Sequence, residues 1–267
     1  DDYLLPRLRS QDAPMLVVVG GSTGAGKSTL VNSILGERVT APGALRPTTR
    51  SPVLVHHPLD TPWFTSDRIF PHLARETGGA PSTPPPPTPH GAPGHRGSPD
   101  RRPNGDDRPA RSLRLVPSEA LPRGLAILDA PDVDSVVVGN RELAAQLLAA
   151  ADLWLFVTTA ARYADAVPWE LLDEGASRRA QVAIVVDRVD PGAEVVADHL
   201  REMLAARGLG HAPVFVIRET SLVDGLLPVS LVAPVSRWLT AVGSDATARD
   251  AVVAATRDGV VDDPVGR

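Results

Sequence analysis

The stretch that decides the fold is GGSTGAGKST, residues 20–29. It contains the pattern G-x-x-x-x-G-K-[ST], directly after an apolar run at 15–19 and at the start of a helix-like run at 27–35. In that strand–loop–helix context, glycines let backbone N–H groups turn toward phosphate oxygens, and the helix N-terminus adds a positive partial charge. A glycine-rich turn that binds nothing is the alternative, and the full match in its proper context argues against it. The sequence therefore predicts a phosphate-binding loop.

One side chain in this loop stands apart from the rest of the chain. Of the 27 basic residues, Lys27 is the only lysine. An ammonium is a compact point charge that fits inside a loop of backbone amides, whereas a guanidinium is a planar fork. We expect Lys27 to span the β- and γ-phosphates of a nucleotide and Ser28 to ligate Mg²⁺. The nucleotide-binding residues predicted in the loop are Gly21, Ser22, Thr23, Gly24, Ala25, Gly26, Lys27, Ser28 and Thr29.

Short apolar runs alternate with helix-like stretches along most of the chain. The predicted strands are 15–19, 53–56, 125–128, 153–158, 181–186 and 214–217, and the predicted helices are 27–35, 141–151, 168–176, 193–207 and 229–240. Most of the strands are apolar at consecutive positions, which is typical of strands covered on both faces. The alternation predicts an α/β fold of the P-loop NTPase kind, a three-layer sandwich with a mostly parallel six-stranded sheet and helices on both faces.

The domain organisation follows from changes in composition. We expect a helical lead-in over 1–14, a nucleotide-binding domain over 15–240, and a tail over 241–267 that begins a further helical region. Residues 78–112 hold 10 prolines and 6 glycines and no leucine, isoleucine, valine or aromatic residue. They predict a disordered insertion between the second and third strands, with a proline-rich docking site as the alternative. Because the chain begins Asp-Asp-Tyr and shows no leader, we expect a cytoplasmic piece of a longer protein.

Charge and composition exclude several classes of function. The net charge of −5 argues against general nucleic-acid binding, and the absence of cysteine excludes disulfides and thiolate metal sites. The window 143–161 is apolar enough to suggest a membrane span, but Asp152 interrupts it, so we predict a helix followed by a buried strand. The His56-His57 pair has no further ligands at a standard metal-site spacing and predicts surface histidines.

Two segments beyond the loop predict a metal site. Thr48 and Thr49 lie in a polar stretch ahead of the second strand, where a threonine can close on Mg²⁺ and the γ-phosphate and release after hydrolysis. The third strand ends at Asp129, and a carboxylate in that place holds Mg²⁺, usually through water. We therefore predict Ser28, Thr49 and Asp129 at the metal, Lys27, Thr49 and Asp129 in catalysis, and Thr48 at the nucleotide. A plain Asp-Ala-Pro-Asp turn is the alternative for the second segment.

The choice of base is expected after the strand at 181–186, where Asp187, Arg188 and Asp190 follow. An aspartate accepts hydrogen bonds from the N1–H and the amine of guanine but would face an acceptor in adenine. Leaving such a buried acceptor unpaired costs about 1–3 kcal/mol. We predict that Asp190 reads the base and that Arg188 lies under its plane, with Asp187 beside them. An Asp-rich loop that opens with Pro191-Gly192 is a serious alternative.

Taken in order, GSTGAGKS, RPTTR, DAPD and DRVD resemble the sequential motifs of Era-type and dynamin-like bacterial GTPases. Residues 147–169 resemble the bacterial dynamin-related group in particular. The resemblance implies a Mg²⁺-dependent GTPase domain that hydrolyses GTP to GDP and phosphate and forms a nucleotide-dependent homodimer. It also implies a parent protein whose other regions associate with a membrane, peripheral to the inner membrane of a bacterium.

The chain departs from the motifs that it resembles. Asp132 stands where the third motif, D-x-x-G, has a glycine whose amide contacts the γ-phosphate, and Asp132 is also a predicted nucleotide contact. Asp187 and Arg188 stand in the first two places of [NT]-K-x-D, while Val133 and Thr23 stand where a glutamine would orient water. We therefore expect slow hydrolysis that dimerisation stimulates. A nucleotide-dependent assembly module with little turnover, and an ATPase, remain as alternatives.

Overall fold

The computed structural model describes residues 13–40, 51–66, 69–77, 112–135, 138–177, 181–193 and 195–244. Its strands are β1 (Met15–Gly21), β2 (Val53–His56), β3 (Ala74–Thr77), β4 (Ser112–Pro117), β5 (Leu125–Asp129), β6 (Leu153–Thr159), β7 (Gln181–Val189) and β8 (Val214–Arg218). Its α-helices are α2 (Lys27–Leu35), α3 (Thr61–Phe64), α4 (Val138–Ala149), α5 (Ala166–Ser177), α6 (Val195–Ala205) and α7 (Val229–Ser244). A 3₁₀ turn at Pro58–Asp60 precedes α3.

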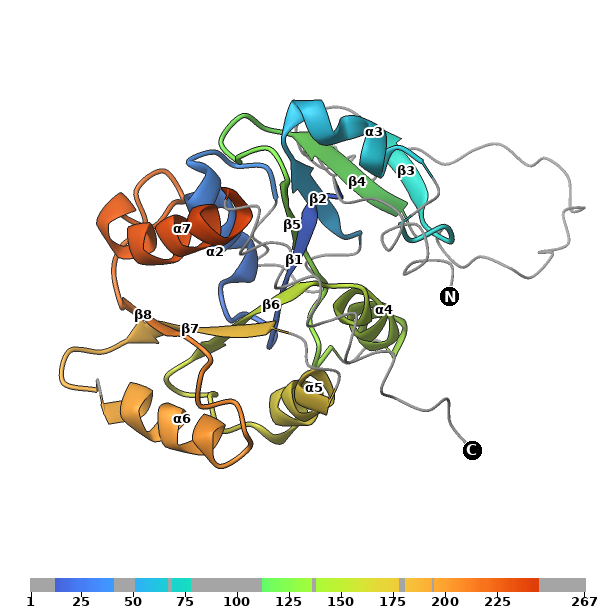
Figure 1. Cartoon of the computed structure of the whole chain (residues 1–267). Coiled ribbons are helices and arrows are strands. Elements are labelled where there is room, and N and C mark those ends of the chain that lie inside the picture. The colour runs from blue at the N-terminus through green and yellow to red at the C-terminus, as the bar shows by residue number, and fades with distance from the viewer. Residues whose placement is uncertain are drawn as a thin grey trace, which may run out of the picture.

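All the described strands belong to one sheet, in the order β3-β4-β2-β5-β1-β6-β7-β8 (Figure 1). The five strands from β5 to β8 in that order run parallel to one another. The other three, β3, β4 and β2, are parallel among themselves, and β2 pairs antiparallel with β5. The predicted mostly parallel α/β sheet is confirmed.

The predicted number of six strands is wrong, because the sheet has eight. The two strands that the sequence did not indicate are β3 and β4, at the far edge from β8. Three of the four residues of β3 are exposed, so this edge strand carries no apolar run. Ser112, which we placed in the proline-rich insertion, begins β4. Most of that insertion, residues 1–12 of the predicted lead-in 1–14 and residues 245–267 of the predicted tail 241–267 lie outside the described residues.

Helices cover both faces of the sheet, and β1 shows how the sequence arranges this. Met15, Val17 and Val19 pack in a cluster with side chains of α2 and α7. Leu16 and Val18 point the other way, into a cluster with side chains of α4, α5 and α6. Successive side chains of a strand alternate between faces, so a strand that is apolar throughout contributes to two cores.

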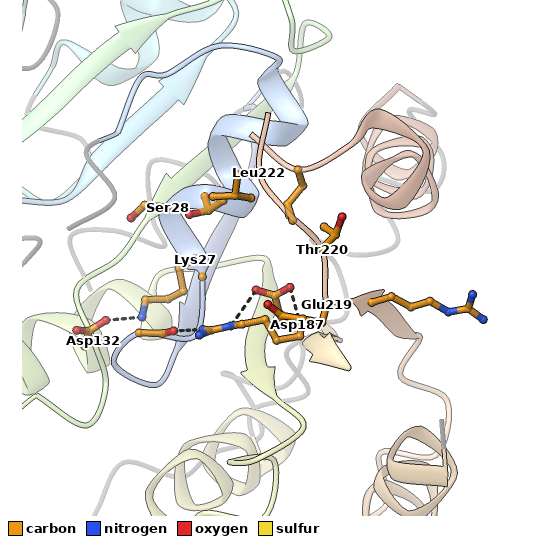
Figure 2. Close-up of a pocket in the computed structure, with 13 residues that line it drawn as sticks. Lys27, Ser28, Asp132, Asp187, Glu219, Thr220 and Leu222 are labelled. Atoms are coloured by element: carbon orange, nitrogen blue, oxygen red, sulfur yellow. Dashed lines mark hydrogen bonds and ion pairs between the residues drawn. The ribbon is translucent and has the colours of Figure 1, made fainter. Parts of the chain in front are cut away.

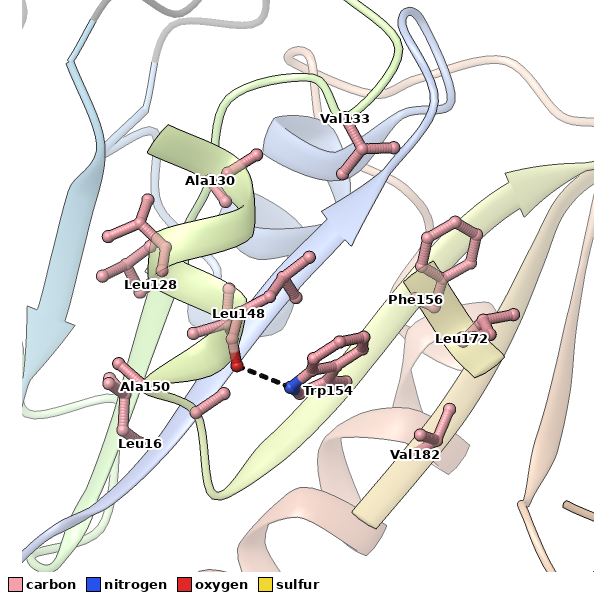
Figure 3. Packing of buried hydrophobic residues seen from close by; sticks show 14 of the residues in the cluster. Leu16, Leu128, Ala130, Val133, Leu148, Ala150, Trp154, Phe156, Leu172 and Val182 are labelled. Atoms are coloured by element: carbon pink, nitrogen blue, oxygen red, sulfur yellow. Dashed lines mark hydrogen bonds between the residues drawn. The ribbon is translucent and has the colours of Figure 1, made fainter. Parts of the chain in front are cut away.

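The apolar window 143–161 divides as predicted into the end of α4 and strand β6. Asp152 is buried at the junction, where its carboxylate accepts a hydrogen bond from the Leu16 amide at 2.7 Å. In β6, the Trp154 indole Nε1–H donates to the Leu148 carbonyl at 2.8 Å (Figure 3). Both polar groups are satisfied within the fold, and across the described ranges we find no helix with the length and hydropathy of a bilayer span.

The prediction that His56 lies on the surface is wrong. Its side chain is fully buried, its ring stacks on Phe64 with centroids 5.1 Å apart, and its Nδ1 lies 2.9 Å from the His57 carbonyl oxygen. Burial lowers the pKa of His56, so the neutral ring is favoured. It is a core residue at the end of β2, a position that its sequence neighbours did not reveal.

Candidate nucleotide site

The candidate site lies at the carboxyl ends of the parallel strands of the sheet. A cavity of about 320 Å³ opens there, and ligands of open α/β sheets commonly bind at these strand ends (Figure 2). The cavity is lined by residues of the loop after β1, the segment after β5, the end of β7 and the segment after β8. The lining residues are Gly24, Gly26, Lys27, Ser28, Thr29, Asp132, Asp187, Arg188, Arg218, Glu219, Thr220, Leu222 and Leu227.

The loop between β1 and α2 adopts a conformation that requires glycine. Gly26 precedes the first residue of α2 with φ of 92°, a left-handed value that residues with a side chain rarely adopt. A Cβ atom on Gly26 would lie 2.5 Å from Asp187 Oδ2, because the carboxylate packs directly against the loop backbone. Gly26 is the last glycine of the phosphate-binding pattern. Any larger residue at this position would have to displace Asp187.

Lys27, the single lysine, is held at the centre of this arrangement. Its side chain is 5% exposed, and its Nζ donates to the carbonyl oxygens of Gly21 at 3.0 Å and Ser22 at 2.9 Å. The third partner is the Asp132 carboxylate, which forms a short ion pair with Nζ (Figure 2). The loop thus curls around its own ammonium, and the Asp132 side chain closes the remaining side.

Ser28 and Asp129 form the part of the site that would hold a metal ion. Ser28 Oγ donates to Asp129 Oδ2 at 2.7 Å. The other oxygen, Asp129 Oδ1, is buried and accepts no hydrogen bond within the described structure. Burial raises the pKa of Asp129, while the bond from Ser28 and the charge of Lys27 act to lower it. A hydroxyl next to a buried carboxylate with one unpartnered oxygen fits a hydrated Mg²⁺ ion.

No cluster of three or more histidine or acidic residues suited to a metal occurs in the ranges that the structure describes. A magnesium site of the predicted type would use Ser28 and Asp129 together with phosphate oxygens. Thr48 and Thr49, the other residues that we predicted at the nucleotide and the metal, lie outside the described residues.

A second polar network ties the segment after β5 to the phosphate-binding loop. The Asp134 carboxylate accepts from the Thr23 amide at 2.6 Å and the Thr23 hydroxyl at 2.7 Å. Arg162, in the loop after β6, donates to Asp134 at 2.6 Å, to the Thr23 carbonyl at 3.0 Å and to Asp165 at 2.8 Å. Although burial acts in the opposite direction, the hydrogen bonds from Thr23 and Arg162 lower the pKa of Asp134.

Of the three residues that we predicted at the base, Asp187 and Arg188 line the cavity and Asp190 does not. Asp187 is buried, and its Oδ1 accepts from the Arg188 amide at 2.9 Å. Burial raises the pKa of Asp187. The Arg188 side chain reaches back to the Gly24 carbonyl, so that both residues line the cavity. Asp190 is exposed and is not among the lining residues.

The remaining predicted residues make contacts within the loop and the neighbouring segments. Gly21 and Ser22 offer their carbonyls to Lys27, Thr23 binds Asp134, and Ala25 and Asp129 are buried. None of these five lines the cavity. Their contacts hold the loop and the neighbouring segments in place.

Sequence reasoning missed a whole wall of the cavity, Arg218 to Thr220 with Leu222 and Leu227. The signal that could have found the first part was the predicted strand 214–217. A parallel strand beside β7 must end at the same edge as β7, so the residues after it face the same cavity. Asp134 and Arg162 were missed as well, and no spacing rule connects them.

Comparison with known proteins agrees with this architecture. The model of the dynamin family matches residues 17–188. Comparison with curated protein sequences finds no match. A solved structure of an oligomerised bacterial dynamin pair, reported to sense and tether membranes, is 14% identical to this chain with a TM-score of 0.57, and the match covers 98% of this chain and 51% of the other.

Two further structures show weaker likeness. Era in complex with MgGDPNP and part of 16S ribosomal RNA is 18% identical with a TM-score of 0.48, over 85% of this chain and 56% of the other. Toc33 from Arabidopsis thaliana, with Mg²⁺ and GMPPNP, is 16% identical with a TM-score of 0.46, over 90% and 89%. The chain thus spans only 51% to 56% of the length of the dynamin and Era chains.

The family match includes the phosphate-binding loop, the segment after β5 and the end of β7 as far as Arg188. Those are the segments that surround Lys27 in the structure, and the sheet places them at one edge. The chain therefore belongs to the dynamin family, and its described residues form the P-loop GTPase domain of a member of that family.

Proposed function

We propose that this domain binds GTP together with Mg²⁺ and hydrolyses it slowly to GDP and phosphate. The observation that carries the proposal is the convergence of Lys27, the bonded pair Ser28 and Asp129, and a cavity of about 320 Å³ at the carboxyl edge of the sheet. A glycine-rich loop, one ammonium and a hydroxyl–carboxylate pair are together typical of a site for a nucleoside triphosphate with Mg²⁺.

Each residue has a distinct task in the proposed reaction. The amides of the loop and the Lys27 ammonium neutralise the phosphates, which lowers the barrier to attack by water at the γ-phosphorus. Bound Mg²⁺ would add charge neutralisation between the phosphates, held by Ser28 and positioned by Asp129. Asp129 Oδ1 would accept from a water molecule in that arrangement. Thr49 remains the predicted residue that closes over the γ-phosphate.

Slow turnover is proposed because Val133 and Thr23 stand in the two positions where a glutamine would orient water. Val133, after the Asp132 position, is buried and apolar, and the Thr23 hydroxyl is already bonded to Asp134. A second copy of the domain is the proposed source of the missing contact, as a nucleotide-dependent homodimer. The bacterial dynamin pair that this fold resembles is oligomerised, which supports testing assembly first.

The proposal is tested by calorimetry with a non-hydrolysable GTP analogue, with Mg²⁺ and with Mg²⁺ removed by a chelator. Lys27→Ala is expected to abolish binding, and Mg²⁺ removal to weaken it at least tenfold. Arg201→Ala is the matched control, since it removes an exposed cation on α6 that pairs only with Asp198 among the described interactions. Tight binding by the Lys27→Ala variant would refute the role of the loop.

Preference for guanine over adenine is part of the proposal and has two candidate residues. Asp187 lies in the cavity wall and Asp190 does not, although the motif places the base contact at Asp190. Competition of ATP and GTP against a fluorescent guanine nucleotide, in Asp187→Ala and Asp190→Ala, identifies which carboxylate carries the preference. Equal affinity of the unmodified protein for both triphosphates would remove GTP specificity from the proposal.

An assembly module with little turnover is the second candidate function. The ion pair between Lys27 and Asp132 favours it, because a carboxylate there hinders the approach of a γ-phosphate. Phosphate release measured at low and high protein concentration separates the candidates. Turnover that rises with concentration supports the GTPase, and turnover that stays absent while assembly follows nucleotide addition supports the module.

We further propose that the parent protein works at the cytoplasmic face of a membrane, through regions outside this chain. The net charge of −5 gives this chain no general attraction to anionic lipid. Sedimentation with anionic vesicles tests this: the full-length parent is expected to pellet and this chain to stay in solution.

A further inference from the structure

The ion pair that closes the phosphate-binding loop has a consequence for which nucleotide the cavity prefers. A lysine ammonium has three donors. In this structure two of them are used by the Gly21 and Ser22 carbonyls, and the third by Asp132. A phosphate oxygen can reach Lys27 on that side only if the Asp132 carboxylate moves away.

This ion pair is not a solvent-exposed contact of small energetic consequence. The side chains of Lys27 and Asp132 are 5% and 19% exposed, so water screens their attraction poorly. Asp132 would also stay close to an incoming phosphate chain after its carboxylate leaves Lys27, because it is one of the residues that line the cavity. It would then repel any negative charge placed beside it.

The layout of the cavity makes this repulsion depend on the length of the phosphate chain. Asp132 lies at one end, beside Lys27, whereas Asp187, Glu219 and Thr220 lie at the other end (Figure 2). A nucleoside held at that second end directs its phosphates along the loop toward Asp132. In that orientation the third phosphate would lie nearest the carboxylate, and it would bring additional negative charge.

Resting on the function proposed above, we propose that Asp132 is a specificity-determining residue that favours the nucleoside diphosphate over the triphosphate. The carboxylate occupies the side of Lys27 that a γ-phosphate needs, while a diphosphate extends less far toward it. The domain is consequently biased toward the product-bound form until something displaces Asp132.

The test compares the affinities of GDP and a non-hydrolysable GTP analogue by calorimetry with Mg²⁺, in the unmodified chain and in Asp132→Ala. The ratio of the dissociation constant of the triphosphate to that of GDP is expected to fall about tenfold, which corresponds to about 1.4 kcal/mol. Asp132→Asn, which keeps an acceptor for Lys27 and removes the charge, is expected to lower the ratio too. It serves as the second variant should Asp132→Ala fail to fold.

Asp198→Ala is the matched control, because it removes an acidic residue that is 73% exposed on α6. It is expected to leave the ratio unchanged. If the unmodified chain binds both nucleotides and the ratio stays within twofold in the folded Asp132 variants, the inference is overturned while GTP binding stands. If the unmodified chain binds neither nucleotide, the proposed function fails and the inference fails with it.

Discussion

The contact between the loop backbone at Gly26 and the Asp187 carboxylate predicts a specific cost for adding one methyl group. A Cβ atom at Gly26 would lie 2.5 Å from Asp187 Oδ2, which is 0.9 Å inside the 3.4 Å at which ordinary contacts begin. Asp187 is buried and bonded to the Arg188 amide, so it cannot swing aside freely. Gly26→Ala must displace that carboxylate.

Gly24 provides the matched comparison within the same loop. Its φ of 73° is also left-handed, but a Cβ atom there would meet nothing within 4 Å. Gly24→Ala should therefore lower the free energy of unfolding only by the backbone strain, about 1–2 kcal/mol. Gly26→Ala adds the displacement of a hydrogen-bonded carboxylate, about 1–3 kcal/mol. Its total cost is then about 2–5 kcal/mol.

A double-mutant cycle with Asp187→Ala isolates the contact. Once Asp187 has lost its carboxylate, Gly26→Ala should cost only the strain of about 1–2 kcal/mol, leaving a coupling of about 1–3 kcal/mol. Urea unfolding of the nucleotide-free chain, followed by circular dichroism, measures all four proteins. The reasoning is refuted if Gly26→Ala and Gly24→Ala cost the same, or if the cost of Gly26→Ala persists without the carboxylate.

Two further predictions concern single groups. Trp154→Phe should lower the free energy of unfolding by about 0.5–1.5 kcal/mol, because it removes one of the two hydrogen bonds to the Leu148 carbonyl, which keeps the Ala151 amide as a donor. Urea unfolding measures this, and an unchanged midpoint would contradict it. The pKa of Asp134 is held below its usual value, so its bonds to Thr23 and Arg162 stabilise the fold above about pH 4 and are lost as the pH falls through the lowered pKa. Asp134→Asn should have a lower thermal midpoint than the unmodified chain at pH 7. The difference between the two midpoints should become smaller as the pH falls. A difference that stays constant with pH would show that the carboxylate charge is not involved.

The parts of the fold that could be predicted from the sequence are those with a strong local pattern. The predicted helix over 27–35 coincides with α2, since glycines and a change of hydrophobic period mark both its ends. Strands β1 and β2, which precede and follow α2 in the sequence, could be predicted because burial on both faces of the sheet requires apolar residues at consecutive positions. The edge strand β3 escaped because three of its four residues face solvent, and exposure imposes no such pattern.

The site could be predicted only where a strand end and a motif coincide. We expected the strand at 181–186 to end before Asp187, but β7 continues to Val189 through an irregularity in its pairing with β8, with Arg188 at a φ of 54°. An irregularity of this kind changes which side chains point toward the cavity, and nothing in the residue types announces it. The approach of Arg162 to Asp134 depends likewise on two loops that only the folded sheet brings together.

The parallel pairing of β3 with β4 sets a minimum length for the proline-rich connection between them. Two neighbouring strands that run the same way cannot be joined by a tight hairpin, because the end of β3 at Thr77 and the start of β4 at Ser112 lie at opposite ends of the strand pair. Because Ala74 pairs with Ser112, those two ends are offset along the strands by about three residues, or about 10 Å. Most of the stretch is therefore surplus to connectivity, and trimming it to about a dozen residues should leave the sheet intact, whereas removing it altogether should detach the outermost strand.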